Sequence, residues 1–331
     1  MKSHARISPV LAMALVSALV SALATSSTSA QAQTWPERSI KFVVPNAAGG
    51  GFDIMARILA ERLQKRLGQS IVVENRAGAG TRTGSTYAAR ATPDGYTWLF
   101  GALSNIALNA GLYKNLAYDP LRDFKPAGLT MIGGYTLVTH KDAKFNSLKE
   151  FVAYAKANPD KATYASAGNG SGQHIAMAVT SGLAGIKLVH VPYRGAQPAY
   201  QDLLAGRVDV FFDSNSGARG LLNGGRTKAL AVSSAKRVPT LPNVPTLQET
   251  GVANFAMESW SGVFLPAATP AAVFERLGKE IRAVMAEPGM AEQARKIGQE
   301  PMIMTGPEAA KFAETEILRW KKLLADNGLA Q

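Results

Sequence analysis

Two glycine-rich segments carry residue types that could hold an anion. The first, Pro45–Asp53, contains Asn46 and three consecutive glycines, and it lies between an apolar strand pattern and a helical pattern. Glycines let the backbone approach a ligand, and the N–H groups at a helix N-terminus carry partial positive charge, so this geometry favours an anion. The alternative is an ordinary tight turn, with Asp53 as the helix N-cap and Arg57 as its partner one turn later.

The second segment, Ser166–His174, places hydroxyl and amide side chains among its glycines and also follows a strand pattern. Such groups donate hydrogen bonds without charge, so they could hold a carboxylate without burying an unmatched cation. Tyr193 and Arg194 follow the next strand pattern, and Asp213 ends the one after it. The alternatives are a capped turn at Ser166–His174 and an Arg194 side chain that faces solvent.

Catalysis and cofactor binding find little support in the sequence. The chain has no Cys and four His, and the histidines lack metal-ligand spacing. Gly78–Gly84 is a weak match to a dinucleotide fingerprint, and no P-loop motif is present. We therefore expect no catalytic residue, cofactor or metal. One alternative stays open: a secreted α/β hydrolase that uses Ser171 and His174, with Asp213 as the acid.

Strand and helix patterns alternate along the chain, which predicts parallel sheets covered by helices. One α/β unit begins at the strand pattern Ser39–Pro45 and a second at Thr163–Ser166. Extended stretches at Phe124–Thr130, Tyr135–Thr139 and Met257–Pro266 join the units in place of a flexible linker. The C-terminal helical patterns could return to the first unit, which would make that unit discontinuous.

Charge is biased toward basic residues in this chain of 331 residues. Lys and Arg number 36 against 24 Asp and Glu, a formal net charge of +12, which is compatible with an anionic partner. The basic residues are dispersed, and the one dense group, Arg319, Lys321 and Lys322, suits the C-terminal end of a helix. Nucleic-acid binding is therefore not expected.

The first residues have the pattern of an export signal. Lys2 and Arg6 precede an apolar run, and Ala30–Ala32 is a small-residue cleavage motif. We expect a signal peptide cleaved near Ala32 and an exported protein. The alternative, a retained membrane anchor, wants a longer apolar run of about 20 residues.

Several motifs in order resemble the Bug-type solute-binding receptors of tripartite tricarboxylate transporters. They are Val44-Pro45 followed by Gly49–Arg57, then Val73–Gly80, Tyr164–His174, Val191–Gly195, Asp202–Gly206 and Pro245–Gly251. The resemblance extends over essentially the whole chain after the leader. It implies an α/β, two-lobed, type II-like periplasmic binding protein, with two parallel or mixed sheets flanked by helices and a ligand cleft between the lobes.

The resemblance also implies a division of the chain and a function. Residues 1–32 would be the signal peptide, 33–134 and 253–331 the first lobe, and 135–252 the second, with a hinge near Met131–Tyr135 and Asn254–Glu258. Such a receptor captures a small organic carboxylate and delivers it to the membrane permease subunits of the transporter. We expect a periplasmic monomer. The implied ligand contacts are Pro45, Asn46, Ala47, Gly50, Gly51, Phe52, Ser104, Asn105, Ser166, Gly168, Asn169, Gly170, Ser171, Tyr193, Arg194 and Asp213.

One departure from the family pattern concerns ligand size. Members often carry a bulky aromatic residue and prolines before the glycine pair, where this chain has Asn46, Ala47 and Ala48. Smaller side chains leave more room, which favours a longer or aromatic acid, such as the benzene dicarboxylate terephthalate. The alternative is that Tyr193 or another side chain refills the space.

Overall fold

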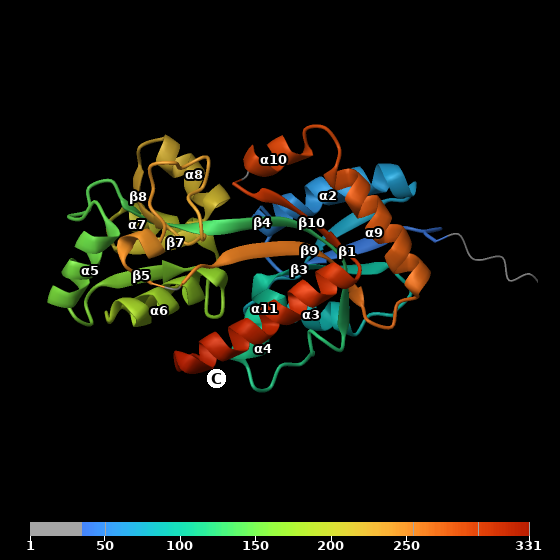
Figure 1. Ribbon diagram of the computed structural model, residues 1–331, viewed down its shortest axis with the longest axis horizontal. Coiled ribbons are helices and arrows are strands. Elements are labelled where there is room, and N and C mark those ends of the chain that lie inside the picture. Colours follow the sequence, from blue (N-terminus) through green and yellow to red (C-terminus); the bar gives the residue numbers. More distant parts are fainter. Residues whose placement is uncertain (1–34, 50, 254, 297, 331) are drawn as a thin grey trace, which may run out of the picture. The chain divides into compact units, whose positions relative to one another are not determined.

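The computed structural model describes residues 35–49, 51–253, 255–296 and 298–330 (Figure 1). Its strands form a ten-stranded sheet in the order β2-β1-β3-β9-β4-β7-β5-β6, and β10 and β8 also pair with β4. The strands are β1 (Ile40–Val44), β2 (Ile71–Asn75), β3 (Thr97–Ala102), β4 (Phe124–His140), β5 (Thr163–Ser166), β6 (Val189–Pro192), β7 (Val210–Ser214), β8 (Thr227–Val232), β9 (Glu258–Pro266) and β10 (Glu300–Thr305). All of them belong to one compact unit, residues 38–331.

Strand β4 joins two halves of the sheet. Over Phe124–Gly134 it pairs with β9 and β10, and over Tyr135–His140 it pairs with β7 and β8. We call β2, β1, β3, β9, β10 and the first part of β4 the first half-sheet, and the remaining strands the second half-sheet. The two stretches predicted on either side of Gly133 are therefore one strand. Glycines at the junction interrupt the side-chain pattern without interrupting the extended backbone.

Parallel pairing is confined to the α/β part of each half. In the first half-sheet β1 lies between β2 and β3, parallel to both, and in the second β5 lies between β6 and β7. The chain must cross over between parallel strands, and a helix makes each crossing. The carboxyl ends of β1 and β5 consequently each lead through a short loop to a helix.

Helices cover both faces of the first half-sheet, with α2 and α9 on one face and α3, α4 and α11 on the other (Figure 1). They are α2 (Gly51–Leu67), α3 (Arg82–Ala89), the π-helix η1 (Leu103–Leu108), α4 (Asn109–Leu112), α9 (Ala271–Met285), α10 (Met290–Lys296) and α11 (Pro307–Asp326). The last three come from the C-terminal part of the chain, so the return to the first unit is observed. Trp98, Trp260 and Trp320 are fully buried in this half.

The second half-sheet carries α6 on one face and α7 and α8 on the other (Figure 1). Its helices are α5 (Leu148–Ala157), α6 (Gly172–Ala184), α7 (Ala196–Leu204), α8 (Asn215–Asn223) and the short 3₁₀-helix η2 (Gln248–Thr250). Within the ranges that the structure describes, no helix combines the length and apolar character needed to cross a membrane.

Candidate functional site

The first predicted loop connects β1 to α2. Pro45 is buried where the strand ends, and Ala47 is exposed. Gly49 has a φ of +77°, in the left-handed region that favours glycine. Gly50 lies outside the described residues. The loop thus brings exposed backbone to the start of a helix.

Helix α2 begins at Gly51, immediately after this loop. The ring of the next residue, Phe52, packs on Phe100 of β3 with centroids 5.3 Å apart. This contact fixes the first turn of the helix against the sheet. Its N–H groups, which lack intrahelical acceptors, are therefore held beside the loop.

A buried carboxylate ties the first loop to its surroundings. Asp53 is 3% exposed, and its Oδ2 accepts hydrogen bonds from the Gly49 backbone N–H at 2.9 Å and from Arg57 Nε at 3.0 Å. Asn75 donates to Asp53 Oδ1 at 3.0 Å and to the carbonyl oxygen of Asn46 at 3.1 Å. Burial raises the pKa of Asp53, but the hydrogen bonds from Arg57, Gly49 and Asn75 outweigh it and hold the pKa below its usual value.

The predicted N-cap role of Asp53 is wrong, although its pairing with Arg57 is confirmed. Asp53 is the third residue of α2, three positions after the cap position at which it was expected. Its carboxylate reaches back to Gly49 from inside the first turn, so it ties down the loop in the place of a cap.

The second predicted loop connects β5 to α6. Ser171 is the N-cap of α6, and its hydroxyl oxygen accepts from the His174 backbone N–H at 3.3 Å. Gly168 and Gly170 have φ values of +121° and +77°. Asn169, between them, is exposed. The prediction of a capped turn is therefore confirmed, and Asn169 is the exposed residue of the loop.

Contacts beneath this loop involve two imidazoles. The Ser166 hydroxyl lies 2.7 Å from His190 Nε2 and accepts from the Gly168 N–H at 3.1 Å. The Gly170 N–H donates to His174 Nδ1 at 3.3 Å. Ser166 was predicted as a ligand contact, but its hydroxyl supports the loop by bonding to His190 and Gly168.

Three buried polar atoms near the carboxyl ends of β1, β3 and β7 have no hydrogen-bond partner within the described residues. They are Asn46 Oδ1, Ser104 Oγ and Asp213 Oδ2. The Asn105 side chain differs, because it accepts from the Ala102 N–H at 2.8 Å and donates to the Ser85 hydroxyl at 3.1 Å. A buried polar atom without a partner is costly, so the three orphans point to a polar guest.

Asp213 is the one acidic residue at these three positions, and its pKa is shifted. It is 3% exposed, and burial raises its pKa to about 6. Its Oδ1 accepts from the Ser214 N–H at 2.8 Å and from Gln173 at 3.5 Å. The Tyr200 hydroxyl beside it, also buried and without a hydrogen bond of normal geometry among the described residues, partly offsets the effect of burial on the pKa of Asp213. A Cβ at Gly217 would lie 2.0 Å from Oδ2, so only glycine fits against this carboxyl group.

Tyr193 and Arg194 lie at the edge of this group. The Tyr193 hydroxyl donates to Asp202 of α7 at 2.7 Å, which fixes its ring on the second half-sheet. Arg194 is exposed, as the alternative interpretation had it. The loops therefore contain no buried, unpaired cation among the described residues.

The second loop touches the first half of the molecule through the segment Gly78–Gly84. A Cβ at Gly80 would lie 2.8 Å from the carbonyl oxygen of Asn169, and one at Gly170 would lie 2.7 Å from the Tyr113 hydroxyl. Both glycines have positive φ. The backbones approach too closely here for any side chain.

From the sequence, Gly78–Gly84 is only a weak match to a nucleotide fingerprint. Its close backbone contact with the second loop was not predicted. Gly84 also packs on Pro45, because a Cβ there would lie 2.9 Å from the Pro45 Cα. Three glycine-rich segments therefore meet in one region. Each of the three segments follows a strand of a predicted parallel sheet, and this shared position could have indicated that they lie close together. His190 was missed as well, although its register opposite Tyr164 on the neighbouring strand follows from the strand pattern.

A second contact joins the halves on the side of α8. Arg219 Nη1 donates to the carbonyl oxygens of Arg295 and Lys296, at 3.1 and 3.0 Å. These carbonyls end α10, where the helix dipole favours a cation.

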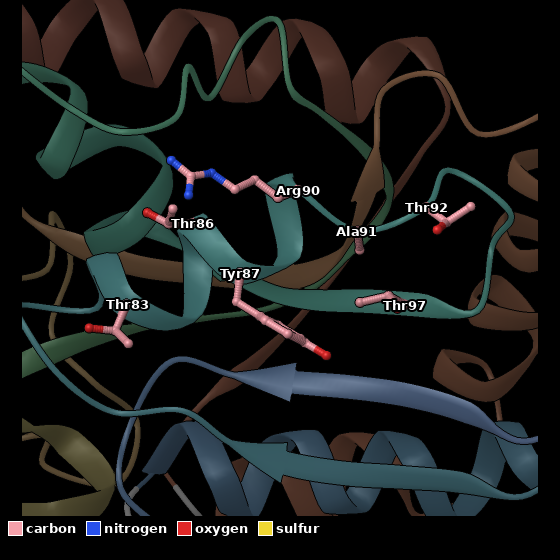
Figure 2. A pocket seen from close by; sticks show the side chains of 7 residues that line it. All are labelled: Thr83, Thr86, Tyr87, Arg90, Ala91, Thr92 and Thr97. Atoms are coloured by element: carbon pink, nitrogen blue, oxygen red, sulfur yellow. The ribbon is translucent and has the colours of Figure 1, made fainter.

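Two surface grooves lie away from the glycine-rich loops. The first, of about 600 Å³, is lined by Thr83 and Thr86 of α3, by Arg90 just after that helix and by Thr97 of β3. Tyr87 points from the helix toward the neighbouring strand β1 (Figure 2). The second, of about 590 Å³, lies between α7 and α8. Both are open to solvent, and neither includes the three orphan atoms.

The hydrolase alternative fails on geometry. The Ser171 hydroxyl caps α6, and His174 Nδ1, which in a triad would donate its proton to the acid, accepts from the Gly170 N–H instead. Across the described ranges, no group of three or more metal-binding side chains comes together.

Comparisons with known proteins agree with this geometry. Residues 55–329 match the model of the tripartite tricarboxylate transporter family receptor. A protein encoded in the tcbD–tcbE intergenic region of Pseudomonas sp. (strain P51) is 38% identical over 307 residues, which are 92% of this chain and 91% of that protein.

Solved structures give the same answer. The periplasmic binding protein BugD is 37% identical with a TM-score of 0.82, over 89% of this chain and 99% of that one. Rpa4515 of R. palustris, solved with adipate, is 32% identical with a TM-score of 0.85 over the same shares. MatC from Rhodopseudomonas palustris, solved with bound malate, is 31% identical with a TM-score of 0.81, over 88% of this chain and all of that one.

The expected α/β periplasmic binding protein fold is thereby confirmed. The resemblance stated from the sequence motifs is confirmed as well, and the family consists of binding proteins, not enzymes. The chain belongs to the receptor family of the tripartite tricarboxylate transporters.

Proposed function

We propose that this receptor captures a small dicarboxylate between the glycine-rich loops of the two half-sheets and delivers it to the permease subunits of its transporter. The observation that carries the proposal is a set of buried orphan atoms: those of Asn46 and Ser104 follow β1 and β3 of the first half-sheet, and that of Asp213 lies near the end of β7 in the second. Dicarboxylates in two relatives, adipate in Rpa4515 and malate in MatC, support the ligand class.

In this proposal neutral donors hold the ligand. The α2 N-terminus, the loop amides and the Ser104 hydroxyl face the acid, and the charges of Asp53 and Arg57 cancel each other. Hydrogen bonds to a charged group contribute about 1.5 to 3 kcal/mol each, so three or four of them, less closure and desolvation costs, reach the roughly 8 kcal/mol of micromolar binding.

Asp213 takes part as a protonated acid. Its pKa of about 6 already lies close to neutral pH, and a ligand carboxylate beside it raises the pKa further. The protonated form donates its O–H to the ligand, whereas the ionised form would repel it. Binding at pH 7 is therefore accompanied by proton uptake.

The ligand is a long or aromatic diacid, such as a benzene dicarboxylate. Ala47 and Ala48 are exposed on the first loop, where family members often carry larger side chains. The space that they leave suits a ring better than a short acid.

Closure of two lobes forms the site. The lobes are residues 33–134 with 253–331 and residues 135–252, and the hinge lies where β4 changes its pairing partners after Gly134. The change of partners supports this boundary. The receptor acts as a periplasmic monomer after removal of residues 1–32, which lie outside the described residues, and it binds no nucleic acid.

The test is a ligand screen by thermal shift, followed by calorimetry. The panel contains adipate, malate, terephthalate, benzoate and the neutral diamide of adipic acid. We expect micromolar binding of at least one diacid, no binding of the diamide, and proton uptake in buffers of different ionisation enthalpy. Strong binding of a sugar or nucleoside, with no acid bound, would overturn the proposal.

A further inference from the structure

Beneath the second loop lies a stack of three rings from three elements. Tyr164 of β5 stacks on His190 of β6 with centroids 4.7 Å apart, and His190 stacks on His174 of α6 at 4.3 Å. The interplanar angles are 15° and 24°. The centroids of Tyr164 and His174 lie 6.4 Å apart, so the three near-parallel rings form a compact cluster under the loop of residues 166–171.

Each imidazole also bonds the loop through a nitrogen. His190 Nε2 contacts the Ser166 hydroxyl at the start of the loop, and His174 Nδ1 accepts from the Gly170 N–H near its end. A nitrogen that accepts from an N–H must carry a lone pair, so His174 holds its proton on Nε2. The two ends of the loop are thus fixed on two rings that also hold each other.

We propose that His174 and His190 are positioning residues that hold the 166–171 loop in its carboxylate-binding conformation, and that they do so only as neutral imidazoles. The inference rests on the proposed function, since this loop is part of the proposed site. Protonation of His174 at Nδ1 would replace the lone pair that accepts from Gly170. Charging both rings would place two cations at stacking distance.

The surroundings favour the neutral forms. Burial lowers the pKa of His174, and burial together with the neighbouring His174 lowers the pKa of His190 to about 4. From β5 the facing titratable group is Tyr164, whose pKa burial raises to about 12, so it stays neutral. Lys187 and Arg194, before and after β6, are exposed. Among the described residues, each histidine is the nearest titratable partner of the other.

Acid should therefore release the loop. The lowered pKa values mean that the folded protein binds fewer protons than the unfolded chain below the ordinary histidine range. The loop conformation is fully held at neutral pH and is lost as the pH falls toward 4. Ligand affinity should then fall through the same pH window.

A ligand-independent experiment reads the histidines directly. Long-range ¹H–¹⁵N spectra of the purified protein would resolve His174, His190 and the distant His140, which lies at the end of β4. We expect both stacked rings to be neutral at pH 7, with the His174 proton on Nε2, and the Gly170 amide resonance to shift when they titrate. A charged ring at pH 7, or a Gly170 amide that does not respond to the titration, would overturn the proposal.

Matched variants connect the rings to binding, with adipate and terephthalate as probes. His174→Asn keeps an oxygen near the Nδ1 position, whereas His174→Phe keeps only the ring. We expect His174→Phe to bind the probe about tenfold more weakly at pH 7 with little change in melting temperature, and His174→Asn to bind within about threefold of the original protein. His140→Asn is the control.

The pH dependence of ligand affinity distinguishes a positioning role of His174 from a purely structural one. The ratio of affinities between the original protein and His174→Asn at each pH cancels protonation of the probe and of Asp213. This ratio should fall as the pH goes from 7 to 4, and a constant ratio, or full affinity in His174→Phe, contradicts the proposal. If the original protein binds no acid, the proposed function fails, while the spectra still decide whether neutral rings hold the loop.

Discussion

The two glycine-rich loops have the same place in their half-sheets but are held by opposite means. Each follows the central strand of a parallel trio and leads into a helix, with glycine at positive φ. The first is tied by the buried Asp53 carboxylate with Arg57 and Asn75. The second is tied by His174 and His190 as uncharged rings.

The difference concerns where charge is allowed beside an anionic ligand. A carboxylate under the first loop is tolerated because Arg57 pairs with it, so that pair adds no net charge to the site. The second loop needs no ion pair, because stacked rings supply both packing and hydrogen bonds. Similar backbone geometry can thus be fixed by charged or neutral contacts, and the two supports should respond differently to mutation and pH.

The largest expected effect comes from breaking the charged support. Asp53→Ala removes the acceptor for Gly49, Arg57 and Asn75, and should lower the free energy of unfolding by about 3 kcal/mol. This value is below the top of the range for buried pairs, because the Arg57 side chain is half exposed. Ligand affinity should fall with it, since the first loop is no longer tied.

Denaturant unfolding of Asp53→Ala measures this effect, with Glu61→Ala as the control. Glu61 lies on the same helix and pairs with Lys65, but both are exposed, so its loss should leave stability nearly unchanged. The lowered pKa of Asp53 gives the sign of the pH dependence. Its contribution is present above the ordinary aspartate range and is lost as the pH falls below it. If Asp53→Ala and Glu61→Ala lower the free energy of unfolding equally, Asp53 does not provide a special support for the first loop.

A second prediction concerns the unpaired acid of the second half-sheet. Burial raises the pKa of Asp213 to about 6, so its ionised form opposes folding. The difference from an ordinary aspartate corresponds to about 2 to 3 kcal/mol at pH 7. Asp213→Asn should raise the free energy of unfolding by about 2 kcal/mol at pH 7, and the gain should vanish as the pH falls from 6 to 4.

The same variant tests the proposed protonation. An asparagine amide donates as the protonated acid does, so Asp213→Asn should keep diacid affinity and lose the proton uptake seen by calorimetry. Asp213→Ala is the matched comparison and should bind less tightly. Proton uptake that persists in Asp213→Asn would assign the proton to another group.

A third prediction distinguishes residues that limit the size of the ligand from residues that donate hydrogen bonds to it. Ala47→Phe adds volume to the first loop and should weaken the largest bound diacid about tenfold, or about 1.4 kcal/mol, while a short acid loses less. Asn169→Ala, on the second loop, should weaken all acids alike. Calorimetry over the ligand panel decides between these patterns. If Ala47→Phe changes every affinity equally, the first loop is not the wall that sets ligand size.

The fold and most of the loops could be predicted from the sequence. Strand β5 lies at the predicted residues, Thr163–Ser166, because apolar periodicity depends only on local spacing. The strand predicted to end at Asp213 instead extends to Ser214. Helix α5 was not predicted, although its sequence is rich in apolar residues. Strand β10 was not predicted either, because its pairing partner β4 is distant in the sequence.

Within the site, long-range contacts account for what the sequence does not reveal. The approach of Gly80 to Asn169 joins segments that are far apart along the chain. The free hydroxyl of Ser104 beside the fully bonded Asn105 is equally invisible, because adjacent residues of similar chemistry differ only in their neighbours. Sequence predicts which loops meet a ligand, but tertiary contacts decide which atoms remain free to bind it.

The smallest expected effect tests one such atom, on a residue that belongs to neither loop. Ser104→Ala removes a buried hydroxyl that has no hydrogen-bond partner among the described residues, so stability should be unchanged or rise by up to about 1 kcal/mol. If the hydroxyl donates to the ligand, affinity should fall about fivefold. Ser171→Ala is the counterpart, because it removes a bonded N-cap and should lower stability by about 1 kcal/mol. Thermal melts and calorimetry on both variants separate a binding hydroxyl from a structural one. Unchanged affinity of Ser104→Ala for every bound acid would show that its free hydroxyl serves no ligand.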